Sequence, residues 1–158
     1  MSKEYVTALR ESLEKKHKVL EEVYRLCELQ SEIIKEETID YDAFDRLFDD
    51  KDVCIEKIEK LDAGFEAVYQ RIKPDLDQNR LLYAADIEAM KREIQAITDI
   101  GTKITALEER NKNKITEAIN KDRRKMADGK RSVSVAMNYY KSMTGTNANQ
   151  SLYMDKKN

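Results

Sequence analysis

Apolar side chains recur along most of the chain at the three- and four-residue spacing of amphipathic helices. In the first segment one heptad position is occupied by Val6, Leu13, Leu20, Cys27 and Ile34, and Leu9 and Val23 are interleaved with it. Lys16 and Gln30 interrupt this stripe with polar groups. The interrupted heptad pattern predicts a helix over about residues 3–37 that packs in a small bundle rather than in a tight two-stranded coiled coil.

A second helix is predicted over about residues 40–73. Asp40 is a suitable N-cap, and Asp42 suits the positive end of the helix dipole. The two heptad positions hold Phe44, Ile58, Phe65 and Ile72, and Leu47, Cys54, Leu61 and Val68. Because proline disfavours the helical conformation at the residue before it, Pro74 is predicted to end this helix.

The third helix is predicted over about residues 82–127. Its apolar stripe consists of Tyr83, Ile87, Met90, Ile94, Ile97, Ile104, Leu107, Ile115 and Ile119. Gly101 interrupts the stripe and is a candidate position for a bend. Three such helices joined by short turns predict an all-α fold, an elongated antiparallel helical bundle or coiled coil formed by residues 1–128.

Residues 129–158 form a separate C-terminal segment and tail. Five apolar residues fall there at helical spacing, namely Val133, Ala136, Met137, Tyr140 and Met143. A helix this short is not stable in isolation, so it has to pack on its own bundle, on a partner, or on each in turn. The polar stretch TGTNANQS follows, and Tyr153 lies beyond it. We therefore predict a short C-terminal helix that binds a partner, followed by a flexible tail.

Composition and charge narrow the class of protein. Charged residues make up 38% of the chain and hydrophobic residues 41%, as is typical of long amphipathic helices. The formal net charge of −2 favours neither nucleic acid nor an acidic membrane surface as the partner. No apolar run is long enough to predict a membrane span. Cys27 and Cys54 lie within helical patterns and are expected to be reduced thiols.

The charges are also unevenly placed along the chain. Residues 36–50 are mainly acidic and residues 121–131 are mainly basic. In an up-down-up bundle both segments lie at the same pole, so we expect the two opposite charges to face each other.

Motifs for catalysis and for cofactor binding were not found. The sequence has no glycine-rich phosphate loop, no Cys-x-x-Cys pair and no constellation suited to nucleophilic catalysis. We expect no enzymatic activity and no cofactor. His17 has only Glu14 and Glu21 one turn away, which are too few ligands to predict a metal site. The basic segment is too short and too poor in interleaved aromatic residues to favour nucleic-acid binding.

The order of these features resembles the FlgN-type flagellar type III export chaperones in their clostridial form. Two heptad helices are followed by a long third helix that contains LEERNKN, then by the basic segment GKRSVSVAMNYY and the terminal motif SLYMDKKN. The C-terminal third carries the specific part of the resemblance. A glycine that usually follows the tyrosine motif is absent from residues 154–158.

The resemblance implies a cytoplasmic chaperone that binds the terminal amphipathic helices of hook-associated axial proteins and delivers them to the flagellar export apparatus. Val133, Ala136, Met137, Tyr140 and Met143 are then the candidate client-binding residues. By its position in the terminal motif, Tyr153 corresponds to the tyrosine that docks on the export gate.

Several alternatives stay open at this point. A second hypothesis is that the client is the filament cap or the filament protein. A third is that the chain is a structural coiled-coil protein that self-associates, for example as a homodimer. Residues 133–143 are alternatively a fourth helix of the bundle, and Tyr153 is alternatively a tail residue without a function.

Overall fold

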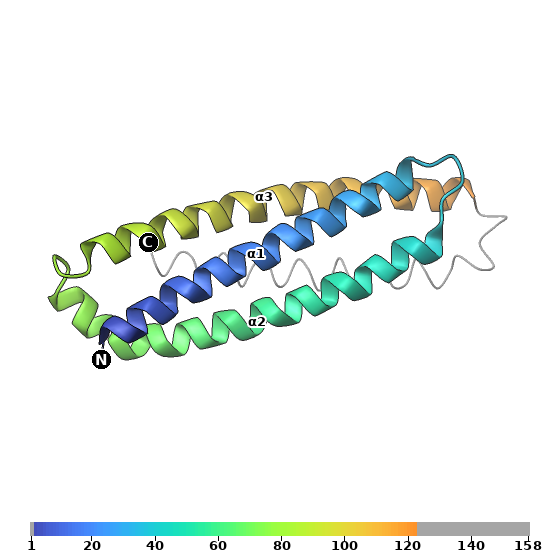
Figure 1. Ribbon diagram of the computed structural model, residues 1–158. Coiled ribbons are helices and arrows are strands. Elements are labelled where there is room, and N and C mark those ends of the chain that lie inside the picture. Colours follow the sequence, from blue (N-terminus) through green and yellow to red (C-terminus); the bar gives the residue numbers. More distant parts are fainter. Residues whose placement is uncertain (1, 123–158) are drawn as a thin grey trace.

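The computed structural model describes residues 2–122 of the chain, which form three long helices. Helix α1 comprises Ser2–Lys35, α2 comprises Tyr41–Gln78 and α3 comprises Ala84–Lys121. Figure 1 shows them side by side as an elongated bundle in which the chain runs up, down and up. The predicted all-α bundle is confirmed for this part of the chain. The predicted C-terminal helix and tail lie outside the described residues.

Helix α1 is the element on which the other two pack. It contacts both α2 and α3 along the bundle, whereas α2 and α3 make few direct contacts with each other. Its buried apolar residues are Val6, Leu9, Leu13, Leu20, Val23, Leu26 and Cys27. No helix within residues 2–122 is long and apolar enough to cross a lipid bilayer.

The start of α2 agrees with the sequence-based prediction. Asp40 is the N-cap, and its side-chain Oδ1 accepts a hydrogen bond of 3.0 Å from the backbone N–H of Ala43. This bond satisfies one of the amide groups that lack a partner in the first turn of a helix.

The predicted end of α2 at residue 73 is wrong, because Pro74 lies inside the helix and α2 continues to Gln78. The proline ring removes one backbone hydrogen bond, but the next turn buries Leu76, which favours continued helix. Asn79 then caps the end. Its backbone N–H donates to the Asp75 carbonyl at 3.0 Å, and its side-chain amide donates to the Asp75 carboxylate at 2.7 Å.

The buried stripe of α2 differs in part from the predicted one. The position occupied by Phe44, Ile58, Phe65 and Ile72 is buried, as predicted. Of the second predicted set, only Cys54 is buried, while Leu47, Leu61 and Val68 are half-buried. The second buried row instead passes through Phe48, Ile55 and Leu76. The prediction chose the neighbouring position because Asp62 interrupts the true row, while Lys51 is a polar member of the first row, seven residues after Phe44.

Helix α3 buries most of its predicted stripe. Tyr83, Met90, Ile97, Ile104, Leu107, Ile115 and Ile119 are buried, and Ile87 and Ile94 are half-buried. The helix is continuous through Gly101, whose carbonyl accepts a hydrogen bond of 3.0 Å from the Thr105 hydroxyl. It ends at Lys121, before the predicted residue 127, with Asp122 as its C-cap.

The end of α3 lies at the pole of the bundle that holds the turn between α1 and α2 (Figure 1). Burial raises the pKa of Tyr41, and the charge of Asp122 contributes to the same shift, which agrees with this placement. This confirms that the acidic turn and the end of α3 share one pole. The remainder of the basic segment, residues 123–131, lies outside the described part of the chain.

Replacing either of the two glycines inside the described helices by alanine should stabilise the protein. Gly64 and Gly101 have negative φ angles, and a Cβ added at either would meet no atom within 4 Å. Gly64→Ala and Gly101→Ala should each raise the free energy of unfolding by about 0.5–1 kcal/mol, because alanine has less backbone freedom to lose. Urea denaturation followed by circular dichroism measures the change. The matched control Ala63→Gly, at the exposed neighbour of Gly64, should lower the free energy of unfolding by a similar amount. A loss of stability in Gly64→Ala would contradict the packing described here.

Candidate functional site

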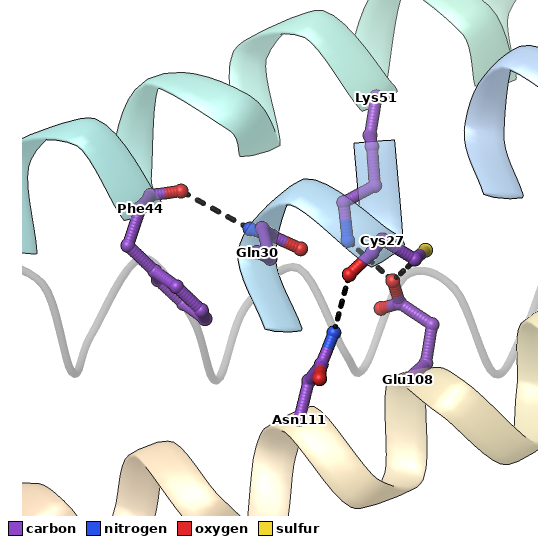
Figure 2. A network of polar contacts seen from close by, with 6 residues as sticks. All are labelled: Cys27, Gln30, Phe44, Lys51, Glu108 and Asn111. Carbon is purple, nitrogen blue, oxygen red and sulfur yellow. Dashed lines mark hydrogen bonds and ion pairs between the residues drawn. The ribbon is translucent and has the colours of Figure 1, made fainter. Parts of the chain in front are cut away.

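A cluster of polar side chains lies inside the bundle, where all three helices meet (Figure 2). We call it the polar cluster, and it consists of Cys27 and Gln30 from α1, Lys51 from α2, and Glu108 and Asn111 from α3. All five residues are buried. They occupy stripe positions that are otherwise apolar, so each needs a hydrogen-bond partner to offset the loss of water.

The centre of the polar cluster is an ion pair between Lys51 and Glu108. Their side chains are only 0% and 5% exposed. The same carboxylate oxygen of Glu108 also accepts a hydrogen bond from the Cys27 thiol. The Lys51 ammonium lies 5.1 Å from the centre of the Phe48 ring, in a cation–π arrangement. One carboxylate therefore receives donors from α1 and from α2, and it links α2 and α3 directly.

Two amide side chains tie α1 to its neighbours on either side of this ion pair. Gln30 donates a hydrogen bond of 3.1 Å to the backbone carbonyl of Phe44 on α2. Asn111 donates a hydrogen bond of 3.0 Å to the backbone carbonyl of Cys27 on α1. Each bond forms in only one alignment of the two helices, so together they fix the register of α2 and α3 relative to α1.

The polar cluster also contains acceptor atoms without a partner among the described residues. These are the second carboxylate oxygen of Glu108 and the amide oxygens of Gln30 and Asn111. A buried polar atom left in this way costs about 1–3 kcal/mol. Apolar residues of similar volume often replace a buried ion pair without loss of stability, so we relate the polar cluster to helix register more than to stability.

The Cys27 thiol of the polar cluster is protonated near neutral pH, which limits its use in nucleophilic attack and metal binding. Burial raises the pKa of the Cys27 thiol strongly; Lys51 opposes this shift and Glu108 adds to it. Burial likewise raises the pKa of Cys54. Both cysteines are free, as predicted, and stay protonated near neutral pH, which makes them poor nucleophiles and poor metal ligands. Within residues 2–122, no group of three or more His, Cys, Asp or Glu residues is placed to hold a metal ion.

Further ion pairs join α1 to both partners toward the other pole. Lys16 binds Asp62 of α2 at 2.7 Å. Arg10 binds Asp86 of α3 at 2.7 Å. These pairs repeat the pattern of the polar cluster, in which α1 contributes a side chain to each neighbouring helix.

His17 has a partner that the sequence did not indicate. Its Nδ1 lies 2.6 Å from a carboxylate oxygen of Glu93 on α3, and its Nε2 lies 3.5 Å from Glu21. The expected neighbour Glu21 is therefore present, and the shorter contact comes from a different helix.

Sequence analysis identified part of the polar cluster. Gln30 was predicted as a polar interruption of the first stripe, and Cys27 as one of its members. Lys51 and Glu108 were missed. The available signal was their spacing, because Lys51 lies three residues after Phe48 and Glu108 lies four residues after Ile104, both of which are buried.

The site residues predicted from the sequence belong to a different part of the chain. Val133, Ala136, Met137, Tyr140, Met143 and Tyr153 all lie outside residues 2–122. Their roles stay predictions.

Comparison with known proteins gives one family. The family model described as FlgN protein matches residues 1–152, which include the bundle and most of the C-terminal segment. No curated protein and no solved structure shows a significant match to the chain.

The buried ion pair predicts an asymmetry between single and double substitutions. Lys51→Met leaves the Glu108 carboxylate buried without its counter-ion, and it should lower the free energy of unfolding by about 3–5 kcal/mol. Adding Glu108→Leu removes that charge and should recover most of the loss. Urea denaturation of both variants measures the two values. A double variant no more stable than Lys51→Met would show that the ion pair is not the source of the cost.

The raised pKa of Cys27 predicts a loss of stability in alkaline solution. The unfolded chain releases the thiol proton near its ordinary pKa of 9.0, while the folded chain retains it. Above that pH the unfolded state binds fewer protons than the folded state, so the free energy of unfolding falls as pH rises. Cys27 should contribute a slope of up to about 1.4 kcal/mol per pH unit, and this contribution should be absent from Cys27→Ala. Urea denaturation at pH 8 and pH 10.5 measures the difference in slope. Equal slopes in the two proteins would contradict the buried position of the thiol.

Proposed function

The chain belongs to the FlgN family, whose members are flagellar export chaperones. We propose that it binds hook-associated proteins in the cytoplasm and delivers them to the type III export apparatus. The observation that carries this proposal is the family match over residues 1–152. The hook-associated proteins form the junction between hook and filament, and their terminal amphipathic helices are the proposed client segments.

The proposed client site is the apolar stripe of the C-terminal segment. It consists of Val133, Ala136, Met137, Tyr140 and Met143. Burying one large apolar side chain contributes about 1.5–3 kcal/mol, so a client helix that covers this stripe gains a useful affinity. Laying an apolar helix face against a second apolar surface is a common mode of peptide recognition.

The bundle buries the apolar stripes of its own three helices, so these stripes are not available to a client. Within the described residues, the exposed large apolar side chains are Leu29, Val53, Leu81 and Leu82. They do not form a heptad stripe along any one helix. A coiled-coil protein that self-associates along its length needs such a stripe, so this distribution of exposed apolar residues favours a chaperone over a structural, self-associating coiled-coil protein.

Tyr153 is proposed to serve a second contact. The polar stretch TGTNANQS separates it from the client-binding stripe. It would therefore engage the export apparatus while the stripe holds the client.

This division predicts different effects for substitutions in the two places. Met137→Asp with Tyr140→Asp should weaken client binding about 100-fold or more, because two buried apolar contacts are lost. Isothermal titration with the purified hook-associated protein measures this affinity. The matched control is Asn138→Asp with Ser142→Asp, which adds the same charge to the opposite face of the predicted helix and should bind nearly normally. Tyr153→Ala should bind the client normally and reduce its export.

Two results would contradict this assignment. An equal loss of client binding in Tyr153→Ala would show one continuous site instead of two. Unfolding of the Met137→Asp, Tyr140→Asp variant, seen by circular dichroism, would show that the segment belongs to the bundle core.

A further inference from the structure

A groove of about 640 Å³ lies between α1 and α2, beside the turn that joins them. We call it the acidic groove. Its lining residues are Leu29, Glu32, Ile33 and Glu36 on one side and Ala43, Arg46, Leu47, Asp49 and Asp50 on the other. All of them belong to the described part of the chain, and none belongs to the polar cluster.

The floor of the acidic groove is apolar. Leu29 is 40% exposed, and Ile33 and Leu47 are half-buried. Val53, which is 53% exposed, continues the same face of α2 one turn beyond Asp49. Exposed apolar side chains that gather on one surface, ringed by polar residues, are typical of a site that binds another protein.

The rim of the acidic groove is strongly negative. Its lining contains four acidic residues, Glu32, Glu36, Asp49 and Asp50, and one basic residue, Arg46. Lys35 neutralises Glu32 at 3.1 Å. No ion pair between residues 2 and 122 includes Glu36, Asp49 or Asp50, so carboxylates outnumber cations along the described rim.

Titratable residues next to the groove, on both α1 and α2, also indicate that negative charge is concentrated there. Burial raises the pKa of Asp52, and the nearby Asp49 carboxylate raises it further, as expected where like charges crowd together. Arg25 on α1 is a nearby cation; it binds Glu22 at 2.5 Å, and Asp50 contributes to its raised pKa. Arg25 therefore forms its ion pair with Glu22, and the Asp50 charge acts on it only as a neighbour.

We propose that the acidic groove binds an amphipathic helix of a partner protein, with an apolar stripe flanked by lysine or arginine. The apolar floor requires an apolar face on the partner, and the rim requires flanking cations. The α2 wall from Ala43 to Asp50 extends over about two helical turns, or about 12 Å, which matches a short helical segment. A phosphorylated or nucleic-acid ligand is disfavoured, because its phosphates would meet the carboxylates. This site is additional to the client-binding stripe of the C-terminal segment.

A pair of synthetic peptides tests the proposal on the full chain. The first is an 18-residue helix with leucines at helical spacing and lysines on both flanks, and the second has glutamate in place of each lysine. Fluorescence anisotropy at low salt should show the lysine peptide binding at least 10-fold more tightly than the glutamate peptide. Its affinity should fall as salt is added, since exposed charges are screened.

Two variants with equal changes of charge locate the peptide. Asp49→Lys with Asp50→Lys reverses part of the rim and should weaken binding of the lysine peptide at least 10-fold. Glu56→Lys with Glu59→Lys makes the same change at exposed positions about two turns further along α2, and it should leave the affinity within about twofold. Equal effects of the two variants would overturn the proposal, because the attraction would then depend on net charge and not on the groove.

The apolar floor is tested separately. Leu29→Asp replaces an exposed leucine, so the bundle should keep its helical content, and it should weaken binding at least 10-fold. Unchanged binding would show that the floor is not used. Binding by neither peptide would also overturn the proposal.

A photo-cross-linking residue placed at position 29 shows what occupies the groove, first in the chain alone and then with the lysine peptide added. Efficient cross-linking to residues 123–131 would show that the chain's own basic segment fills the groove. Efficient cross-linking to a second copy would show a dimer interface. Either result would overturn the proposal of a partner helix, whereas cross-linking to the lysine peptide that excess unlabelled peptide suppresses would support it.

Discussion

The buried ion pair between Lys51 and Glu108 is the contact on which the arrangement of the three helices depends. Helices α2 and α3 otherwise pack mainly on α1, and the Glu108 carboxylate joins all three through Lys51 and Cys27. A shift of α2 or α3 by one turn would leave a charge buried without its partner, at a cost of several kcal/mol. The polar cluster therefore acts less as a source of stability than as a selector of one register.

The sequence predicted the helices well, because apolar side chains recur at a fixed spacing over long stretches. The prediction was wrong or incomplete where a residue occupies an environment that is unusual for its type, such as a proline inside a helix or a charged residue in the core. Pro74 normally ends a helix, but the burial of Leu76 and the capping by Asn79 carry α2 one turn further. Lys51 and Glu108 resemble surface residues, since only the position of the third helix shows that each has a buried partner. Local periodicity places both residues on a buried stripe, but it does not show which distant residue pairs with each.

The fold places the acidic groove and the end of α3 at one pole of the bundle. The groove lies beside the turn between α1 and α2, and α3 ends at the same pole (Figure 1). The chain therefore continues from α3 into the C-terminal segment at the pole that holds the groove. The polar cluster keeps the register of the three helices below this pole.

In the proposed mode of binding, the client engages the C-terminal segment and the bundle stays closed. Amide hydrogen exchange of the full chain, measured by mass spectrometry with and without a purified hook-associated protein, tests this most directly. We expect slower exchange in residues 129–143 on binding and unchanged exchange in the buried turns of α1 around Cys27 and Gln30. Faster exchange in those turns would show that the client opens the bundle, and the C-terminal segment would then not be the whole client site.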